Sequence, residues 1–213
     1  FACQVTLLRA DTGEELSAVE QRMLQMAGAG SCQDLIDQGQ DRLHYYLECL
    51  ARKHRTPDLT INTAVVQAKP AEAILAYAEA EDIDLIVMGS QGASGLQEMF
   101  IGSNTEKVVR RSKIPVLVIK KEVDKFEVND MIFASDFNKE SKTTFQRVAD
   151  FADLFGAKVH LLYINTIHNF NTTKNIEKRI ADFMDDFDFS NYTTMIYNDI
   201  SIEKGILSYA RDI

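Results

Sequence analysis

The sequence predicts an α/β protein: an open parallel sheet with helices on both faces, built as two tandem repeats. Short β-branched strands alternate with amphipathic helices, which is the pattern of parallel βαβ units. Two landmarks also recur in the same order. Residues 1–12 match 155–166 at an offset of 154, and residues 74–78 match 206–210 at an offset of 132. With 46% apolar and 26% charged residues, the composition is that of a folded globular protein.

In the first copy, the alternation predicts strands at 4–9, 59–66, 85–88 and 116–119. Helices are predicted at 16–28, 33–54, 71–81 and 103–112. Pro70 precedes the first turn of the third helix, and Ser103-x-x-Glu106 predicts a capping box at the start of the fourth.

In the second copy, strands are predicted at 131–134, 158–164 and 192–197, and helices at 141–155, 176–187 and 202–211. A charged linker at 120–125 joins the copies. We therefore expect a first domain at 1–121, which lacks its first strand and helix in this chain. The second domain is expected at 126–213 and lacks its last strands. One complete domain with a fortuitous repeat is the alternative.

Charge and cysteine content exclude several classes of protein. The 23 Lys and Arg against 32 Asp and Glu give a net charge of −9, which disfavours nucleic acid as a partner. No apolar run approaches the ~18 to 20 residues of a membrane span, and no signal segment opens the chain, so we expect a cytoplasmic protein that does not bind membranes. Cys3, Cys32 and Cys49 have no metal-binding or CxxC spacing and are predicted to be core thiols. The histidines lack metal spacing as well, so no metal site is predicted.

The most informative segment is a buried strand that runs into glycines, Asp84-Leu-Ile-Val-Met-Gly-Ser-Gln-Gly92, followed by Gly102-Ser103 at a predicted helix start. Glycine permits φ > 0 and lets backbone N–H groups approach a ligand, and a helix N-terminus adds free N–H groups. This segment suits phosphate oxygens, although the glycines could also be turn formers only. It is neither a Walker loop nor GxGxxG.

These residues, with Val108-Val-Arg-Arg-Ser-Lys-Ile-Pro-Val-Leu-Val-Ile119, resemble the nucleotide-binding end of a universal stress protein. The resemblance covers both copies and implies the family's five-stranded parallel fold of the adenine nucleotide alpha hydrolase type. In ATP-binding members, the glycine loop and the Gly-Ser pair hold the phosphates and ribose, and the strand end lies by the ribose or base. The residues so assigned are Met88, Gly89, Gln91, Gly92, Gly102, Ser103 and Asn104.

The second copy resembles the other half of such a site. Phe133-Ala-Ser-Asp-Phe137 is similar to the end of the family's first strand, where an aspartate meets the adenine, so Asp136 is a candidate adenine contact in the second domain. Ala68-Lys69-Pro70 departs from the family, because ATP-binding members commonly have Gly-x-Pro there. A methyl group beside the ligand would weaken binding.

The leading hypothesis is a stress-response regulatory protein whose first domain binds an adenine nucleotide, ATP or its products, with Mg²⁺ as a candidate companion. We expect self-association within the tandem or as a homodimer. No catalytic residue is predicted, because the loop has no general base, catalytic Lys or paired carboxylates, and any ATPase activity should be slow. The alternatives are an α-hydrolase-type nucleotidyl enzyme, whose SGGxDS-like loop is not seen, and a dimerising scaffold that pairs through strand 116–119.

Overall fold

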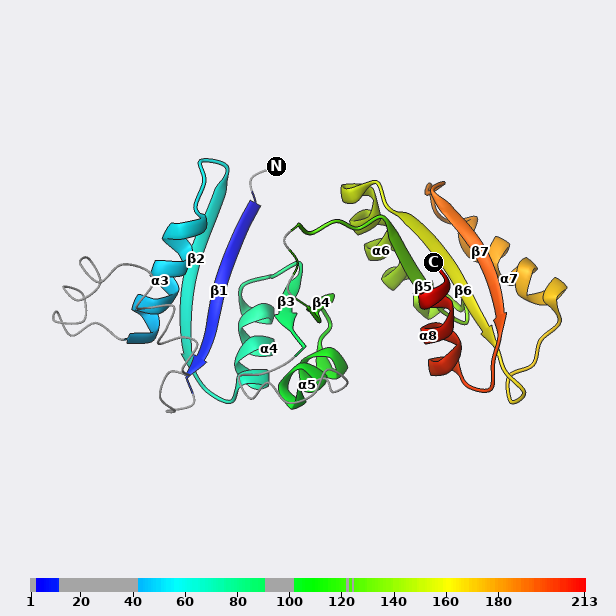
Figure 1. Ribbon diagram of the computed structural model, residues 1–213, viewed down its shortest axis with the longest axis horizontal. Coiled ribbons are helices and arrows are strands. Elements are labelled where there is room, and N and C mark those ends of the chain that lie inside the picture. Colours follow the sequence, from blue (N-terminus) through cyan, green and yellow to red (C-terminus); the bar gives the residue numbers. More distant parts are fainter. Residues whose placement is uncertain (1–2, 12–41, 91–101, 122, 124) are drawn as a thin grey trace. The chain divides into compact units, whose positions relative to one another are not determined.

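The computed structural model describes residues 3–11, 42–90, 102–121, 123 and 125–213 (Figure 1). The chain divides into two compact units, Phe1–Glu122 and Val123–Ile213. Every ladder between its strands is parallel, and the predicted α/β class with parallel sheets is confirmed. Among the described residues, no helix has both the length and the apolar character needed to cross a bilayer.

The first unit contains two parallel ladders. Its elements are β1 (Cys3–Asp11), α3 (Arg42–His54), β2 (Leu59–Gln67), α4 (Pro70–Ala80), β3 (Ile86–Gly89), α5 (Ser103–Arg111) and β4 (Val116–Ile119). β1 pairs with β2, and β3 pairs with β4. A core of Ala71, Ala78, Ile86 and Val108 joins α4 and α5 to β3. This core fixes the start of α5 relative to the end of β3.

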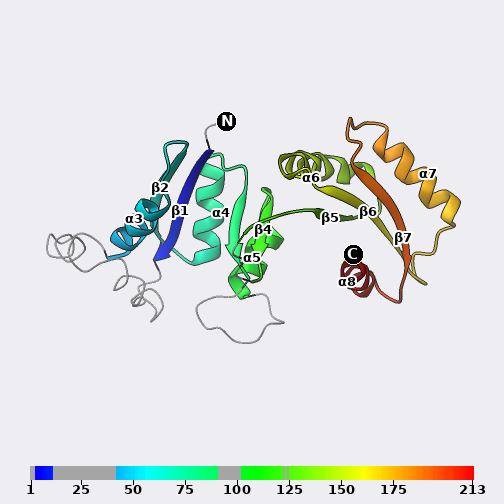
Figure 2. The same ribbon diagram turned by 45° about the horizontal axis from the view of Figure 1, so that its top comes forward.

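The second unit is a three-stranded parallel sheet in the order β5-β6-β7. Its elements are β5 (Asp130–Ala134), the 3₁₀ turn η1 (Lys139–Ser141), α6 (Lys142–Phe155), β6 (Lys158–Asn165), α7 (Thr173–Met184), β7 (Tyr192–Asn198) and α8 (Ile202–Asp212). Helices α6 and α7 cover one face and α8 the other (Figure 2). The central strand β6 is therefore buried on both faces, which explains its near-continuous run of apolar residues.

The internal repeat is visible in the element bounds. An offset of 154 moves β1 from 3–11 to 157–165, and β6 spans Lys158–Asn165. An offset of 132 moves α4 from 70–80 to 202–212, which are the bounds of α8. In the second unit, β5 precedes β6 in the chain and pairs with it. Among the described strands of the first unit, none occupies the matching place beside β1.

The N-terminus of α5 differs from the prediction in its cap, and that of α7 differs in its first residue. The capping box at Ser103 is wrong, because the N-cap of α5 is Gly102, and the carboxylate of Glu106 instead pairs with Arg110 at 3.0 Å. Helix α7 begins at Thr173 rather than 176, because the Thr172 side chain caps it by accepting from the backbone N–H of Asn175. The predicted helix at 16–28 and residues 33–41 of the next lie outside the described residues.

The cysteines are less buried than predicted. Cys3 is exposed on β1 and Cys49 is half-buried on α3, so neither is a core thiol. Cys32 lies outside the described residues.

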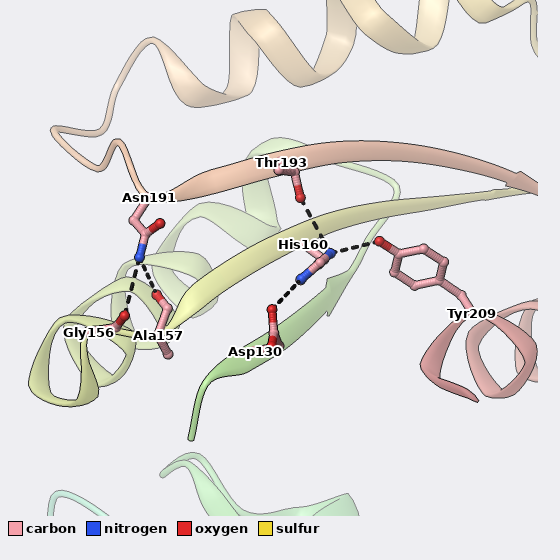
Figure 3. Close-up of polar contacts among 7 residues, drawn as sticks. All are labelled: Asp130, Gly156, Ala157, His160, Asn191, Thr193 and Tyr209. Atoms are coloured by element: carbon pink, nitrogen blue, oxygen red, sulfur yellow. Dashed lines mark hydrogen bonds and ion pairs between the residues drawn. The ribbon is translucent and has the colours of Figure 1, made fainter. Parts of the chain in front are cut away.

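His160 on β6 ties three other elements of the second unit together (Figure 3). Its Nε2 lies 2.9 Å from Oδ1 of Asp130 on β5, and its Nδ1 lies 2.7 Å from the hydroxyl of Tyr209 on α8. The hydroxyl of Thr193 on β7 is 3.4 Å from the same Nδ1. A carboxylate can only accept, so Nε2 carries a proton, and in the neutral ring Nδ1 accepts from Tyr209. The buried histidine therefore has a structural role.

Tyr209 should make the second unit sensitive to alkaline pH. Burial, and then the negative charge of Asp130, raise the pKa of its phenol above the ordinary value of 10.0. At a pH between about 10 and the raised pKa, the Tyr209 phenol keeps its proton in the folded state but has lost it in the unfolded state. The free energy of unfolding should therefore fall as pH rises through this range. We expect Tyr209→Phe to cost about 1 kcal/mol near pH 7, where the hydrogen bond is lost, and progressively less above pH 10.

Urea unfolding at intervals between pH 7 and pH 11 measures this difference. Tyr197→Phe on β7 is the matched control, because Tyr197 also packs against Tyr209, with ring centroids 6.0 Å apart. A gap between wild type and Tyr209→Phe that stays constant across this range would contradict the expectation.

Candidate nucleotide-binding site

The described part of the glycine-containing segment begins where β3 ends. The backbone N–H of Ser90 donates to the carbonyl of Ile119 on β4 at 2.9 Å. The N–H of Gly102 donates to the carbonyl of Ser90 at 2.7 Å. Ser90, just after β3, is therefore bonded both to β4 and to Gly102, the residue that precedes α5. Gln91 and Gly92, which were predicted to bind nucleotide, fall between these positions and lie outside the described residues.

A buried threonine fastens the first turn of α5 to β3. The side-chain hydroxyl of Thr105, which is 4% exposed, donates to the carbonyl of Gly89 at 2.9 Å. The backbone bond between Gly102 and Ser90 and this side-chain bond hold the helix start against the strand end. Sequence reasoning missed Thr105. Its place three residues before the fully buried Val108, on the same helix face, was the available signal.

The N-terminus of α5 is open to solvent. Its N-cap, Gly102, has no side chain to accept from the first-turn N–H groups, and Ser103 and Asn104 are exposed. The first backbone N–H groups of a helix have no partner within the helix, and with the helix dipole they favour an anion. The φ angle of Gly102 is −56°, so this glycine is not left-handed as its sequence setting suggested. What glycine offers here is the absence of a side chain beside those N–H groups.

The comparison with known families decides what this segment belongs to. The family model described as "Universal stress protein family" matches residues 2–120, more than half of the chain. The chain belongs to the universal stress protein family.

Curated relatives agree with this assignment, and a solved structure agrees with the fold. Universal stress protein MJ0531 of Methanocaldococcus jannaschii is 43% identical over 61 residues, which are 29% of this chain and 36% of that protein. YxiE of Bacillus subtilis is 38% identical over 74 residues, 35% of this chain and 50% of the relative. The matches thus span between a third and a half of these relatives. The fold of a putative universal stress protein from Pseudomonas aeruginosa UCBPP-PA14 covers 98% of this chain and 78% of its own, with a TM-score of 0.61 and 16% identity.

Two other residues of this universal stress protein that were assigned to nucleotide binding, Gly89 and Met88, differ in their exposure to solvent. Gly89 is exposed at the end of β3. Met88, just before it, is half-buried and packs against the core of the first unit. The departure at Ala68 lies in the turn between β2 and α4, where the N–H of Ala68 donates to the carbonyl of Val66 at 3.1 Å.

In the second unit of this universal stress protein, Asp136 is exposed in the loop after β5. Its carboxylate accepts from the backbone N–H of Asn138 at 3.4 Å and from the Asn138 side-chain amide at 3.1 Å. The two bonds go to different oxygens of the Asp136 carboxylate, Oδ1 and Oδ2. Each oxygen keeps a further lone pair that can accept from an amine donor.

Acidic and histidine side chains of the described ranges do not gather into a cation site. Within the described ranges, no group of three or more His, Cys, Asp or Glu side chains is placed to hold a metal ion. The arrangement at β3 and α5 consists of backbone donors and a helix dipole, which can bind an anion through the protein's own N–H groups.

Proposed function

We propose that the first unit of this universal stress protein binds an adenine nucleotide, ATP or its products, and acts as a regulatory binding module in the stress response. The observation that carries the proposal is the open N-terminus of α5, held by two hydrogen bonds at the carboxyl end of β3. In open α/β sheets, ligands bind outside the carboxyl ends of the strands.

The chemistry of this end favours phosphate. The exposed first turn offers backbone N–H donors at Ser103 and Asn104, and Gly89 and Gly102 put no side chain between them and a ligand. Charge-assisted bonds from such donors to phosphate oxygens are stronger than neutral ones. The resemblance of the glycine-containing segment to ATP-binding members of the family supports the adenine nucleotide as the ligand, and Mg²⁺ would reach the site with the phosphates. Since the assigned residues include no general base, hydrolysis should be slow.

We include in the proposal that the second unit is a second universal stress protein domain. The family model covers only the first unit, but the internal repeat relates β6 to β1 and α8 to α4. Among the described strands, the first domain, at 1–121, then has no counterpart of β5, and the second, at 126–213, has none of β3 or β4. In the second domain, Asp136 occupies the position of the adenine contact.

Nucleotide binding is tested on the purified full chain. Mass spectrometry after denaturation should reveal a retained adenine nucleotide, or calorimetric titration with ATP, ADP and AMP, with and without Mg²⁺, should give saturable binding. A protein that is empty and shows neither heat of binding nor a thermal shift at millimolar nucleotide overturns the proposal. Such a result would favour a dimerising scaffold, for which β4 is the candidate surface because it pairs only with β3 among the described strands.

A further inference from the structure

A cleft lies within the Val123–Ile213 unit, and Asp136, the candidate adenine contact, is one of its lining residues. Its volume is about 700 Å³, and its walls are the 136–142 segment after β5 and one side of α7. Asn175, Lys178, Arg179 and Asp182 lie three and four residues apart, which places them on one side of that helix. The 136–142 segment follows the carboxyl end of β5, and α7 covers the same face of the sheet as α6 (Figure 2).

Positive charge is concentrated in this cleft. The unit has 10 Lys and Arg and 15 Asp and Glu, a net charge of −5. Four of the ten basic residues line the cleft, Lys139, Lys142, Lys178 and Arg179, against three of the fifteen acidic residues. The cleft is thus a local reversal of the unit's overall charge, which favours an anion as its ligand.

The four basic side chains of the cleft differ in the hydrogen bonds and ion pairs that they form within the protein. Lys142 forms an ion pair with Asp186. Arg179 donates one weak hydrogen bond of 3.4 Å to the backbone carbonyl of Asp136, leaving most of its five donors available. The side-chain ammonium groups of Lys139 and Lys178 form no hydrogen bond or ion pair with the residues that the structure describes. Both are exposed, one on each wall, so they can approach a ligand from two sides.

The two walls are fixed to each other before any ligand arrives. Phe137 has a φ angle of 55°, rare for a bulky residue, and its ring is only 4% exposed. That ring contacts Phe183 of α7 edge to face, with centroids 5.4 Å apart. The bond from Arg179 to Asp136 joins the same two segments. A ligand therefore meets cations whose backbone positions are already set, which lowers the ordering cost of binding.

We propose that this cleft binds a compact anion that carries two or more phosphate groups, through Lys139, Lys178 and Arg179. The inference is independent of nucleotide binding by the first unit. Glu140 and Asp182 also line the cleft, so their charge favours a short polyphosphate held by the lysines over a long polyanion that must pass the carboxylates. Inorganic polyphosphate and the triphosphate of a nucleotide share this chemistry.

The test is calorimetric titration of the full chain at low salt with inorganic tripolyphosphate and, in parallel, with ATP. We expect the double variant Lys139→Gln/Lys178→Gln to lose one equivalent of tripolyphosphate binding, or to bind it at least about tenfold more weakly, because two charge-assisted contacts are removed. The matched control is Lys174→Gln/Lys204→Gln, which removes the same charge from α7 and α8 outside the cleft. Circular dichroism establishes that both variants fold.

The outcomes separate this site from the one in the first unit. If the first unit binds nothing, wild type should still bind one equivalent, and the cleft variant alone should lose it. Tighter binding of ATP than of tripolyphosphate at the cleft identifies a nucleotide, and the reverse identifies inorganic polyphosphate; either upholds the proposal. A wild-type chain that binds no tripolyphosphate, or a cleft variant that binds as the control does, overturns it.

Discussion

Replacing Phe145 with alanine should destabilise the second unit by about 3–5 kcal/mol, the usual cost of truncating a fully buried phenylalanine. The side chain is 0% exposed. Its ring lies at the centre of an aromatic cluster, with centroid distances between 4.7 and 6.1 Å to four neighbours, Phe133, Phe183, Phe187 and Phe189. Alanine would remove these edge-to-face contacts and leave a cavity between α6, α7 and the sheet.

Urea unfolding followed by circular dichroism measures the loss as an earlier transition of the second unit. Domains are stable by only about 5–15 kcal/mol, so Phe145→Leu, which keeps most of the volume and should cost less, provides a folded variant for comparison. Phe170→Ala is the control, because Phe170 is 71% exposed and its truncation should change little. Equal midpoint shifts for Phe145→Ala and Phe170→Ala would show that the aromatic cluster does not hold this unit together.

Most of the fold could be predicted because two independent signals agree along the chain. Hydrophobic alternation placed strand 158–164 within one residue of β6, Lys158–Asn165. The repeat provides a second, independent prediction of the helices. The match of Ile206-Leu-Ser-Tyr-Ala210 to residues 74–78 sets an offset of 132, and the same offset relates α4 to α8. Apolar periodicity reports which face is buried, and burial is what selects these elements.

Helix starts were harder, because a capping motif competes with backbone contacts that the sequence does not display. Ser103-x-x-Glu106 has the pattern of a capping box. The helix does begin at Ser103, but its N-cap is Gly102, whose N–H donates to the Ser90 carbonyl. At α7, Thr172 is an equally ordinary N-cap that the apolar pattern starting at Ile176 concealed.

In the candidate sites too, residues that belong to a local sequence pattern could be predicted, whereas residues brought together by tertiary packing could not. Gly89, Gly102 and Ser103 could be singled out because glycines after a buried strand form a local pattern. For Thr105 the only signal is its helical spacing from Val108, because its hydrogen-bond partner is a backbone carbonyl sixteen residues away. The cations of the cleft in the second unit come from two segments about forty residues apart, and only the packing of α7 beside the loop after β5 brings them together.

Replacing Ser103 with aspartate should abolish or strongly weaken nucleotide binding while leaving the first unit folded. The side chain is exposed on the first residue of α5, where the proposal places the phosphates. A carboxylate at roughly 5 Å from a phosphate charge repels it by about 3 kcal/mol at an effective dielectric constant of about 20. We therefore expect at least a tenfold loss of affinity for ATP, and a smaller loss for AMP, which carries fewer charges.

The same substitution should stabilise α5 by about 0.3–1 kcal/mol, because a negative charge in the first turn interacts favourably with the helix dipole. Binding and stability should thus move in opposite directions, which separates a blocked site from a damaged fold. Ser103→Ala, which leaves the backbone N–H groups in place and adds no charge, is the matched control and should bind ATP within a few fold of wild type. Calorimetric titration and thermal unfolding measure both quantities on the same samples. If Ser103→Asp binds ATP as tightly as Ser103→Ala does, the phosphates do not lie at this helix end.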